Sequence, residues 1–282
     1  DLWNEIENLN RFQIGVQKNI EHVKFLKSQL SQKKSDNESE KKNLISIKGE
    51  LLDQRSIVDT NKSQKAKLLS DTQNKEADFK KQLAEKKRLS EAFLQELNSY
   101  ESQLRFIIDP SSYPSSGKGI LAGPLDKIFI TQRFGDTDFA RSGAYSGKGH
   151  NGVDFRATTG TKVMSALGGV VQGIGDTDIV KGCYSYGKWV LVKHGNGLST
   201  LYSHLSLVKV AQGETVTAGQ TIGYSGYTGY VSPPGPQGAH LHFGVFASQG
   251  VKIIQYTNSI NCKNAFIPVA DIRAYLNPLL YL

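Results

Sequence analysis

The sequence predicts an α + β protein with two regions, a long N-terminal helix that pairs in a coiled coil and a mostly antiparallel β-sheet domain after it. Residues 1–108 contain no proline and two of the 28 glycines, whereas the rest of the chain holds all eight prolines. Apolar residues recur at heptad spacing in the first region, and short β-rich runs separated by turn residues fill the second. A length of 282 residues is consistent with two domains.

The composition changes at Asp109-Pro110, where a stretch rich in proline, serine and glycine begins. Such a stretch is typical of a linker. We therefore expect three parts, which are a coiled coil over residues 1–108, a linker over 109–118 and the β-sheet domain over 119–282.

The helical region follows one heptad frame from Leu2 to Ile107. Twelve of the sixteen residues in the first seam are apolar. The second seam is apolar at both ends, but its middle is basic, with Lys27, Lys34, Lys41, Lys48, Arg55 and Lys62. Because the frame keeps its phase, we favour one mostly continuous helix of about 160 Å, at 1.5 Å per residue. A helical hairpin that turns at 34–37 or 59–61 is the alternative.

A helix with a narrow apolar stripe needs a partner helix in water. The partner could be a second copy, another protein or a preceding helix that is missing here, since the chain begins at Asp1 in mid-pattern without a methionine. A charged, solvated helix without a partner is the alternative. No run of eighteen apolar residues exists, so we expect no membrane span; we expect a processed or truncated chain, in which no signal peptide remains to be read.

The second region reads as strands joined by turns. The runs 188–193 and 198–202 flank Gly195-Asn196-Gly197, a strong hairpin signal. Further strands are expected at 163–171, 220–224 and 240–247. We expect a groove across one face of the sheet, walled by the loops 134–149, 175–187, 226–239 and 247–267.

The net charge of +8 divides into 20 basic and 17 acidic residues over 1–108, and 14 and 9 over the remainder. Lysine and glutamate interleave along the predicted helix, as on a coiled-coil surface, and neither region has a nucleic-acid-binding motif. We therefore expect no nucleic-acid partner; the positive balance favours an anionic wall or membrane surface. Cys183 and Cys262 are spaced too widely for a zinc ribbon, and a disulfide and two separate buried thiols both stay open.

Four of the six histidines fall into three short motifs of the second region. The motifs are His150-Asn151-Gly152-Val153-Asp154, Tyr202-Ser203-His204-Leu205 and His240-Leu241-His242. Two histidines and an aspartate meet the needs of a catalytic zinc site, which uses three protein ligands and leaves a position for water. The alternative is a set of ordinary half-buried strand histidines that bond to backbone carbonyls.

The spacing indicates which of these side chains can converge. His240 and His242 are two residues apart, so on a strand both point to the same face. His150 and Asp154 are four apart, roughly 13 Å on a straight strand. The backbone must bend to bring them together, and Gly152 allows it.

The acidic residues limit the mechanism. Residues 109–282 contain a single glutamate, Glu214, in a turn away from the histidine motifs, and no His-Glu-x-x-His helix. A thermolysin-like mechanism is therefore excluded. The general base must then be a histidine or the water bound to the metal.

In their order, the three motifs resemble those of the lysostaphin or LytM-type zinc metalloendopeptidases, which hydrolyse peptidoglycan. That family has His-x-x-x-Asp, then a lone histidine in Tyr-x-His-Leu, then His-x-His. The resemblance implies that His150, Asp154 and His242 bind Zn²⁺. It also implies that His204 and His240 are catalytic, as the base and as the group that polarises the substrate or stabilises the oxyanion.

The resemblance covers roughly residues 119–282, although Gly238-Ala239 stands where the family usually has a proline. It implies an extracytoplasmic, zinc-dependent endopeptidase that cleaves peptide cross-bridges of bacterial peptidoglycan, as in cell division. The coiled coil would position or regulate the enzyme, with a second copy, the missing helix or a cell-envelope regulator as partner. The alternative function is a non-catalytic scaffold that activates other murein hydrolases. A lipoyl or biotinyl carrier is excluded because no lysine lies in the turn 224–227.

Overall fold

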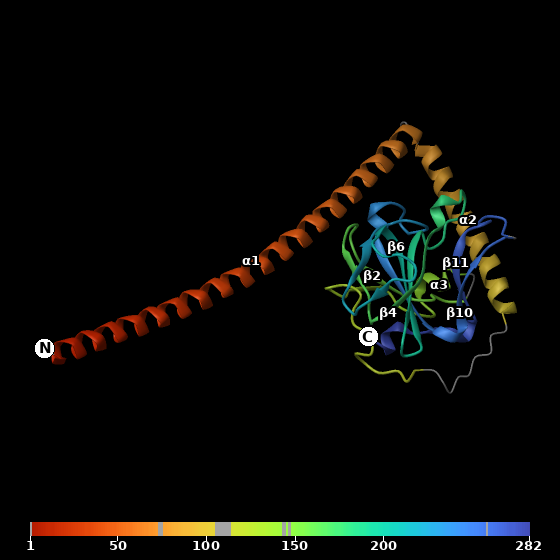
Figure 1. The fold of residues 1–282 in the computed structure, drawn as a ribbon. Helices are drawn as coiled ribbons and strands as arrows, with labels where there is room; N and C mark the ends of the chain where they lie inside the picture. Colours follow the sequence, from red (N-terminus) through yellow and green to blue (C-terminus); the bar gives the residue numbers. More distant parts are fainter. Residues whose placement is uncertain (1, 73–75, 105–113, 143–144, 146–147, 258) are drawn as a thin grey trace. The chain divides into compact units, whose positions relative to one another are not determined.

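The computed structural model describes residues 2–72, 76–104, 114–142, 145, 148–257 and 259–282 (Figure 1). Two long helices, α1 (Leu2–Thr72) and α2 (Glu76–Gln103), come first, and a short helix α3 spans Asp138–Arg141. The strands are β1 (Ile130–Gln132), β2 (Val153–Arg156), β3 (Lys162–Met164), β4 (Gly169–Asp176), β5 (Lys188–His194), β6 (Leu198–Val208), β7 (Thr215–Val216), β8 (Thr221–Ser225), β9 (His240–Ala247), β10 (Val251–Gln255), β11 (Phe266–Ala270) and β12 (Tyr275–Leu276). The predicted fold class, a long helical region followed by a mostly antiparallel sheet, is confirmed.

The helical region divides differently from our expectation. In place of one mostly continuous helix, two helices, α1 and α2, are described, and residues 73–75 between them lie outside the described residues. Helix α2 ends at Gln103, and Ile107, where the predicted frame ended, also lies outside the described residues. Both positions considered for a hairpin turn, 34–37 and 59–61, lie inside α1. Heptad phase alone therefore did not locate the helix ends.

The large sheet is antiparallel throughout its described strand pairs. Its main path runs β1-β2-β9-β6-β5-β4-β7, β8 pairs with β6 and β3, and β12 pairs with β9. The predicted hairpin is present between β5 and β6, where Gly197 adopts a φ of 84° that glycine tolerates best. The strand expected at 163–171 is interrupted, since β3 ends at Met164 and β4 begins at Gly169.

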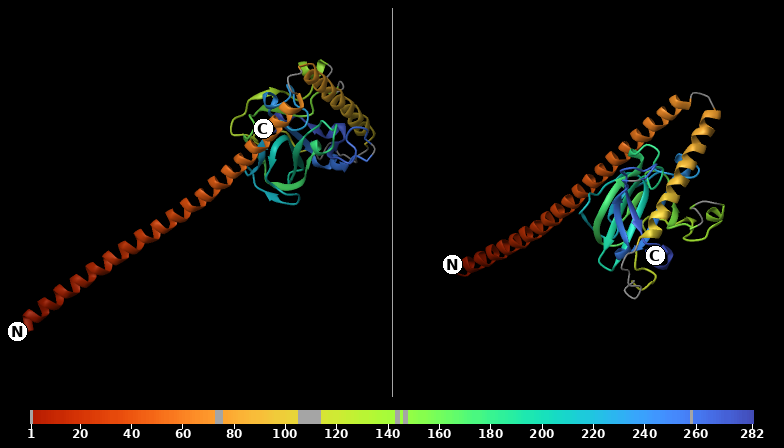
Figure 2. Two further views of the ribbon diagram at one scale, coloured as in Figure 1. Left: turned by 90° about the horizontal axis from the view of Figure 1, so that it is seen from above. Right: turned by 90° about the vertical axis from the view of Figure 1, so that its right-hand side faces the viewer.

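The central sheet is buried on both faces, because alternate residues of a strand point to opposite sides. Along β5, Val190 and Val192 enter one hydrophobic core, whereas Trp189 and Leu191 enter the other. The second core is covered by the β10–β11 pair and by α2, which contacts β11 (Figures 1 and 2).

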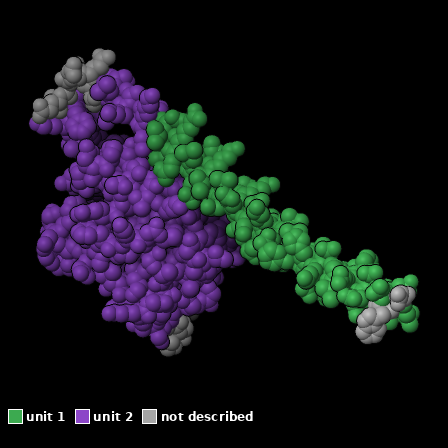
Figure 3. Space-filling model, turned by 90° about the vertical axis from the view of Figure 1, so that its left-hand side faces the viewer, with its two compact units in different colours: residues 1–59 green, residues 60–282 purple. Residues whose placement is uncertain are grey.

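Two residues of α2 pack into the core of the sheet domain. Phe93 and Leu97 are 0% and 3% exposed and belong to the second core. Residues 60–282, which include α2, accordingly form one compact unit, and residues 1–59 form another (Figure 3).

The segment between helices and sheet is only partly described. Residues 109–113 of the predicted linker lie outside the described residues. The rest of the linker, 114–118, forms neither helix nor strand. Of the helices that the structure describes, none is long and apolar enough to cross a membrane.

Candidate metal centre

The histidine motifs meet where β2, β9 and β6 lie side by side. His242 of β9 is opposite Asp154 of β2 on one side and Ser203 of β6 on the other. His240, two residues earlier on β9, faces the same side, and its Nε2 lies 3.7 Å from Asp154 Oδ1. Strand register therefore brings these side chains together.

His150 reaches the same point through a bend before β2. It forms an isolated bridge with Gly135, and β2 begins after it. A Cβ added at Gly152 would lie 2.6 Å from the carbonyl oxygen of Phe243 and 2.7 Å from Cε1 of His242. The expected bend is present, and glycine is required there because backbone and imidazole approach so closely.

His204 is turned into the site by a bulge in β6. Three steps along β6, from Tyr202 to Leu205, match two steps along β5, so one residue of β6 is extra. His204 lies in this bulge with a φ of 60°, a left-handed conformation that is uncommon for histidine. The bulge places its ring 4.7 Å from that of His240, between centroids.

Three donor atoms from buried residues lie close together in the site. His150 Nε2 is 3.0 Å from His242 Nδ1 and 3.2 Å from Asp154 Oδ1, and the last two atoms are 3.0 Å apart. A tetrahedral site with bonds of about 2.0–2.1 Å separates its donors by roughly 3.3 Å. The three atoms can therefore share one ion of that size.

Backbone carbonyls determine which nitrogen each imidazole presents. Three rings place Nδ1 on a carbonyl oxygen, namely His150 on Arg133 at 3.0 Å, His204 on Thr228 at 2.8 Å and His240 on Gly238 at 2.7 Å. A carbonyl oxygen can only accept, so each Nδ1 carries the hydrogen and donates it. The alternative from the sequence, histidines that only bond to backbone carbonyls, thus accounts for Nδ1 of each ring. It leaves each Nε2 with a free electron pair.

The donor set fits a zinc ion. With Nδ1 of His150 donating to Arg133, its Nε2 and Asp154 Oδ1 face each other with electron pairs, and a bound cation between them would remove that repulsion. His242 is turned the other way, since its Nδ1 faces the two donors and its Nε2 is buried beside Gly152 without a partner among the described residues. Two imidazole nitrogens and a carboxylate oxygen are ligands that Zn²⁺ prefers.

The environment keeps the donors in the protonation states that a metal requires. Burial would raise the pKa of Asp154, but the neighbouring His150 and His242 outweigh it and hold that pKa well below its usual range. Burial, followed by the neighbouring histidines, lowers the pKa of His204 well below its ordinary value. Burial also lowers the pKa of His242. The site therefore combines an ionised carboxylate at Asp154 with neutral imidazoles at His204 and His242.

Comparison with known proteins assigns this arrangement to a family. Residues 148–254 match Peptidase family M23. Residues 148–254 form a Peptidase M23 domain within the β-sheet region. The predicted family resemblance is therefore confirmed, and the match includes every residue of the three motifs.

Curated relatives match part of the chain. Peptidoglycan DD-endopeptidase ShyA of Vibrio cholerae is 36% identical over 123 residues, 43% of this chain and 24% of the relative. DD-carboxypeptidase/endopeptidase Mpg of Neisseria meningitidis is 40% identical over 94 residues, 33% of this chain and 19% of the relative. Cell division protein DipM of Caulobacter vibrioides is 33% identical over 145 residues, 49% of this chain and 21% of the relative. The matched part of the chain spans less than a quarter of each relative.

A cleft of about 760 Å³ in the M23 domain is lined by all five predicted site residues. Three of the four loops expected to wall it contribute to the lining, and none of the described lining residues comes from 247–267. Helix α2 lines the cleft instead, with Glu91 and Glu101 among its residues. The search for glutamates near the site considered only residues 109–282 and therefore did not include these two.

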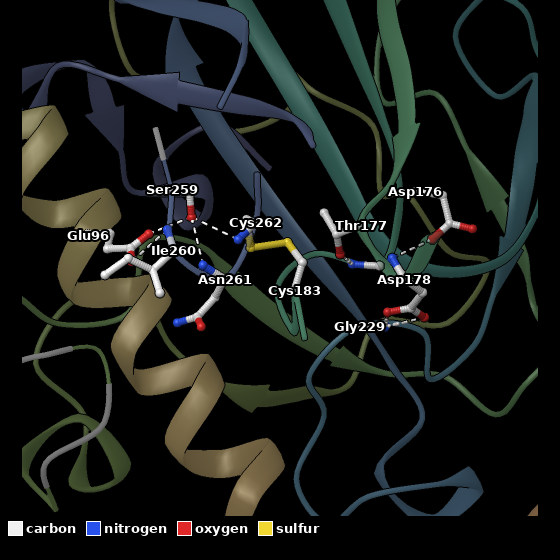
Figure 4. The surroundings of a disulfide bond; sticks show 11 residues. Glu96, Asp176, Thr177, Asp178, Cys183, Gly229, Ser259, Ile260, Asn261 and Cys262 are labelled. Carbon is white, nitrogen blue, oxygen red and sulfur yellow. Dashed lines mark hydrogen bonds between the residues drawn. A yellow bond between two sulfur atoms is a disulfide. The ribbon is translucent and has the colours of Figure 1, made fainter. Parts of the chain in front are cut away.

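The two cysteines form a disulfide beside the M23 domain's cleft, which decides between the two alternatives left open by the sequence (Figure 4). Cys183 precedes β5 and Cys262 lies between β10 and β11. Glu96 of α2 accepts hydrogen bonds from Ser259 Oγ at 2.5 Å and from the N–H of Ile260 at 3.2 Å. The helix is thus bonded to the loop that the disulfide cross-links.

Two tyrosines of the M23 domain's cleft were not found by sequence reasoning. Tyr145 stacks on the His150 imidazole at a centroid distance of 5.1 Å. The Tyr186 ring lies 5.9 Å from that of His242, and its hydroxyl accepts a hydrogen bond from Asn151 at 3.0 Å. The proximity of Tyr145 to His150 in the chain was a signal for the first; no local pattern marks the second.

Proposed function

We propose that the chain is a zinc-dependent endopeptidase that cleaves peptide cross-bridges of bacterial peptidoglycan outside the cytoplasm. The convergence of His150 Nε2, His242 Nδ1 and Asp154 Oδ1 within an M23 peptidase domain carries this proposal. The name of the relative ShyA, a peptidoglycan DD-endopeptidase, supports the substrate class, and that of Mpg supports an endopeptidase activity. The disulfide supports an oxidising compartment, where such bonds persist.

In this proposal His150, Asp154 and His242 hold the zinc ion. Bound Zn²⁺ supplies Lewis-acid polarisation of a carbonyl group and lowers the pKa of water. The Nδ1–H of His150, which donates to the carbonyl of Arg133, fixes the orientation of that ring. The ionised Asp154 compensates part of the metal's charge.

His204 and His240 are the catalytic residues of the proposed reaction. Each presents an unprotonated Nε2, which can take a proton from the attacking water and return it to the leaving amine. Burial lowers the pKa of His204 well below its ordinary value, which favours a neutral ring there. We therefore assign the general base to His240, and to His204 the role of a neutral ring that orients the water.

Glu91 offers a competing base, because it also lines the cleft. Glu91→Gln preserves the size of the side chain and removes the carboxylate. If a histidine is the base, this variant retains the wild-type rate, whereas His240→Ala and His204→Ala each keep zinc and lose at least about a hundredfold in rate. A hundredfold loss in Glu91→Gln with an active His240→Ala would assign the base to Glu91.

The metal assignment is tested with purified full-length protein, by mass spectrometric metal analysis and by digestion of defined muropeptides. The wild type is expected to hold one zinc and to release a new amine that mass analysis identifies. Asp154→Ala should lose both zinc and hydrolysis. Full zinc content and full hydrolysis in this variant would contradict the ligand assignment.

His194→Gln is the matched control for Asp154→Ala. His194 is a buried histidine whose bonds, to the carbonyl of Gly168 and the hydroxyl of Thr200, lie outside the site. This variant should retain zinc and hydrolysis. A wild type that holds zinc without cleaving any muropeptide would favour the non-catalytic scaffold that activates other murein hydrolases.

We further propose that α1 pairs in a coiled coil. Leu9, Leu30 and Leu51 of its first seam are 66%, 70% and 68% exposed in the single chain. Such a stripe requires a partner helix, which is a second copy, a preceding helix or a cell-envelope regulator. Sedimentation of the full chain tests the second copy, since a dimer that Leu30→Lys with Leu51→Lys dissociates is expected. A monomer at all concentrations would exclude self-pairing.

A further inference from the structure

The imidazole of His204 is oriented by a backbone carbonyl of a neighbouring loop. Its Nδ1 lies 2.8 Å from the carbonyl oxygen of Thr228 and donates its hydrogen to it. The partner of one ring nitrogen decides which nitrogen carries the hydrogen and how the ring is turned. The position of the Thr228 carbonyl therefore sets the direction of Nε2, the nitrogen that is left for the reaction.

The carbonyl of Thr228 and the N–H of Gly229 belong to one peptide group. A trans peptide is planar, and its carbonyl and N–H point to opposite sides. Both carboxylate oxygens of Asp178 accept this N–H, Oδ1 at 3.1 Å and Oδ2 at 3.0 Å (Figure 4). His204 and Asp178 thus hold the same peptide group from opposite sides. A carboxylate on the N–H also polarises the peptide group, which makes its carbonyl a stronger acceptor for the imidazole.

The side chain of Thr228 holds the same peptide group against β5 and β6. Its hydroxyl oxygen accepts the N–H of Lys188 at 3.0 Å and donates to the carbonyl of Leu205 at 2.8 Å. Glycine is required at Gly229, which has a φ of 74°, because an added Cβ would overlap the carbonyl oxygen of Ser185. The peptide group is therefore closely packed as well as hydrogen-bonded, and its carbonyl has a defined direction.

We propose that Asp178 is a positioning residue of the hydrolytic site, which acts on His204 through the Thr228–Gly229 peptide group. Asp178 lies in the short helical turn Thr177–Ile179 after β4, outside the three histidine motifs. Its carboxylate keeps the carbonyl of Thr228 aimed at Nδ1 of His204, so that the ring keeps its hydrogen on Nδ1 and its electron pair on Nε2. This inference rests on the catalytic role of His204 in the proposed function.

The test uses full-length variants that change one partner of the peptide group at a time. Asp178→Ala removes the acceptor, whereas Asp178→Asn keeps an Oδ1 that can accept the same N–H. Thr228→Val removes the hydroxyl at similar size and leaves the peptide group in place. The matched control is Tyr227→Phe in the same loop, which cuts the hydroxyl bonds to Asn61 and Gln64 without touching the peptide group.

Three measurements are made on each variant. They are kcat and KM on a defined muropeptide, the zinc Kd by competition with a chelator in the absence of substrate, and the tautomer of His204 from long-range proton–nitrogen NMR spectra. The His204 signal is assigned by its loss in His204→Ala. The NMR readout distinguishes an effect on this ring from a general loss of structure.

Asp178→Ala should lower kcat by about tenfold, a part of the roughly hundredfold loss for the whole ring. It should also raise the share of His204 that carries its hydrogen on Nε2, and leave KM and the zinc Kd unchanged because no metal ligand is altered. Asp178→Asn should recover most of the loss, and Thr228→Val should lower kcat in the same way as Asp178→Ala. Tyr227→Phe should match the wild type.

Equal losses in Tyr227→Phe and Asp178→Ala would overturn the proposal, because the effect would then belong to the placement of the whole loop. A wild-type kcat and tautomer in Asp178→Ala, or no recovery in Asp178→Asn, would overturn it as well. If Asp178→Ala does not fold, Thr228→Val decides, and a wild-type kcat and tautomer in that variant refute positioning by the peptide group. A wild type that binds zinc and cleaves nothing would instead contradict the proposed function, while the tautomer of His204 still tests the role of Asp178.

Discussion

Substitution of Phe93 tests whether α2 is a structural part of the sheet domain. The side chain is fully buried in the second core, and its ring meets that of Tyr256 edge-on at 5.6 Å. A Phe→Ala change in a core costs about 3–5 kcal/mol of unfolding free energy. For a unit of this size each kcal/mol shifts Tm by roughly 2–4 °C, so Phe93→Ala should lower Tm by about 6–20 °C.

Phe79→Ala is the matched control, because Phe79 lies on the same helix and is 40% exposed. Exposed substitutions change unfolding free energy by about 0.5 kcal/mol or less, or roughly 2 °C here. Calorimetry gives both Tm values, and near-ultraviolet circular dichroism follows the environment of Trp189 in the same core. Equal shifts in the two variants would refute the packing of α2 on the sheet.

Because α2 packs in the core of the sheet domain, removal of the helical region is not a clean test of whether that region regulates hydrolysis. A truncated chain that starts near Ser111 would remove Phe93 and Leu97 from the second core along with the wall of the cleft. Its hydrolysis rate would then combine the opening of the cleft with the loss of core packing. A substitution on the cleft-facing side of α2 separates the two effects.

Three further predictions concern α2 and the loops around the cleft. Leu94 lines the cleft, so Leu94→Ala should raise peptidoglycan hydrolysis severalfold if α2 gates access, and unchanged rates would leave a passive spacer. Replacement of both Cys183 and Cys262 by serine should lower the free energy of unfolding by roughly 4.5 kcal/mol, because the disulfide closes a loop of 79 residues and so restricts the unfolded chain. An unchanged denaturation midpoint would contradict this prediction. Burial raises the pKa of Glu101 above 4.5, so the folded state keeps the carboxyl proton to higher pH than the unfolded state does. The contribution of Glu101 to the free energy of unfolding is therefore greatest below about pH 4.5 and declines as the pH rises through the raised pKa. The Tm of the wild type should therefore fall relative to that of Glu101→Gln between about pH 4 and 7, and parallel pH profiles would exclude this linkage.

The periodicity of strands predicts most of the candidate site, but it does not predict the backbone bulge that positions His204. His240 and His242 share a face because strand side chains alternate, and the pairing of β2 with β9 sets Asp154 opposite His242. His204 follows a different rule, since it enters the site through a bulge defined by the unequal pairing of β5 and β6. Such a bulge depends on the partner strand, so the residues around His204 alone do not specify it.

The partner of α2 shows a second limit of sequence patterns. Heptad spacing predicts that one face of a helix is buried, but not what buries it. Phe93 and Leu97 occupy seam positions of the predicted coiled coil, yet they enter the core that contains Trp189 of the sheet domain. The physical reason is the apolar second face of the sheet, which must be covered and which α2 covers together with β10 and β11.

The same packing explains why the carboxylates of the cleft escaped the sequence analysis. When Phe93 and Leu97 enter the second core, the residues on the adjoining face of α2 are carried to the edge of the cleft. Glu91 and Glu101 lie on that face, because residues three and four positions apart share one side of a helix. A search for catalytic carboxylates confined to residues 109–282 could not include them. One wall of the cleft therefore comes from α2. The apolar spacing of this helix indicates that it packs against a partner, but not that the partner is the sheet domain.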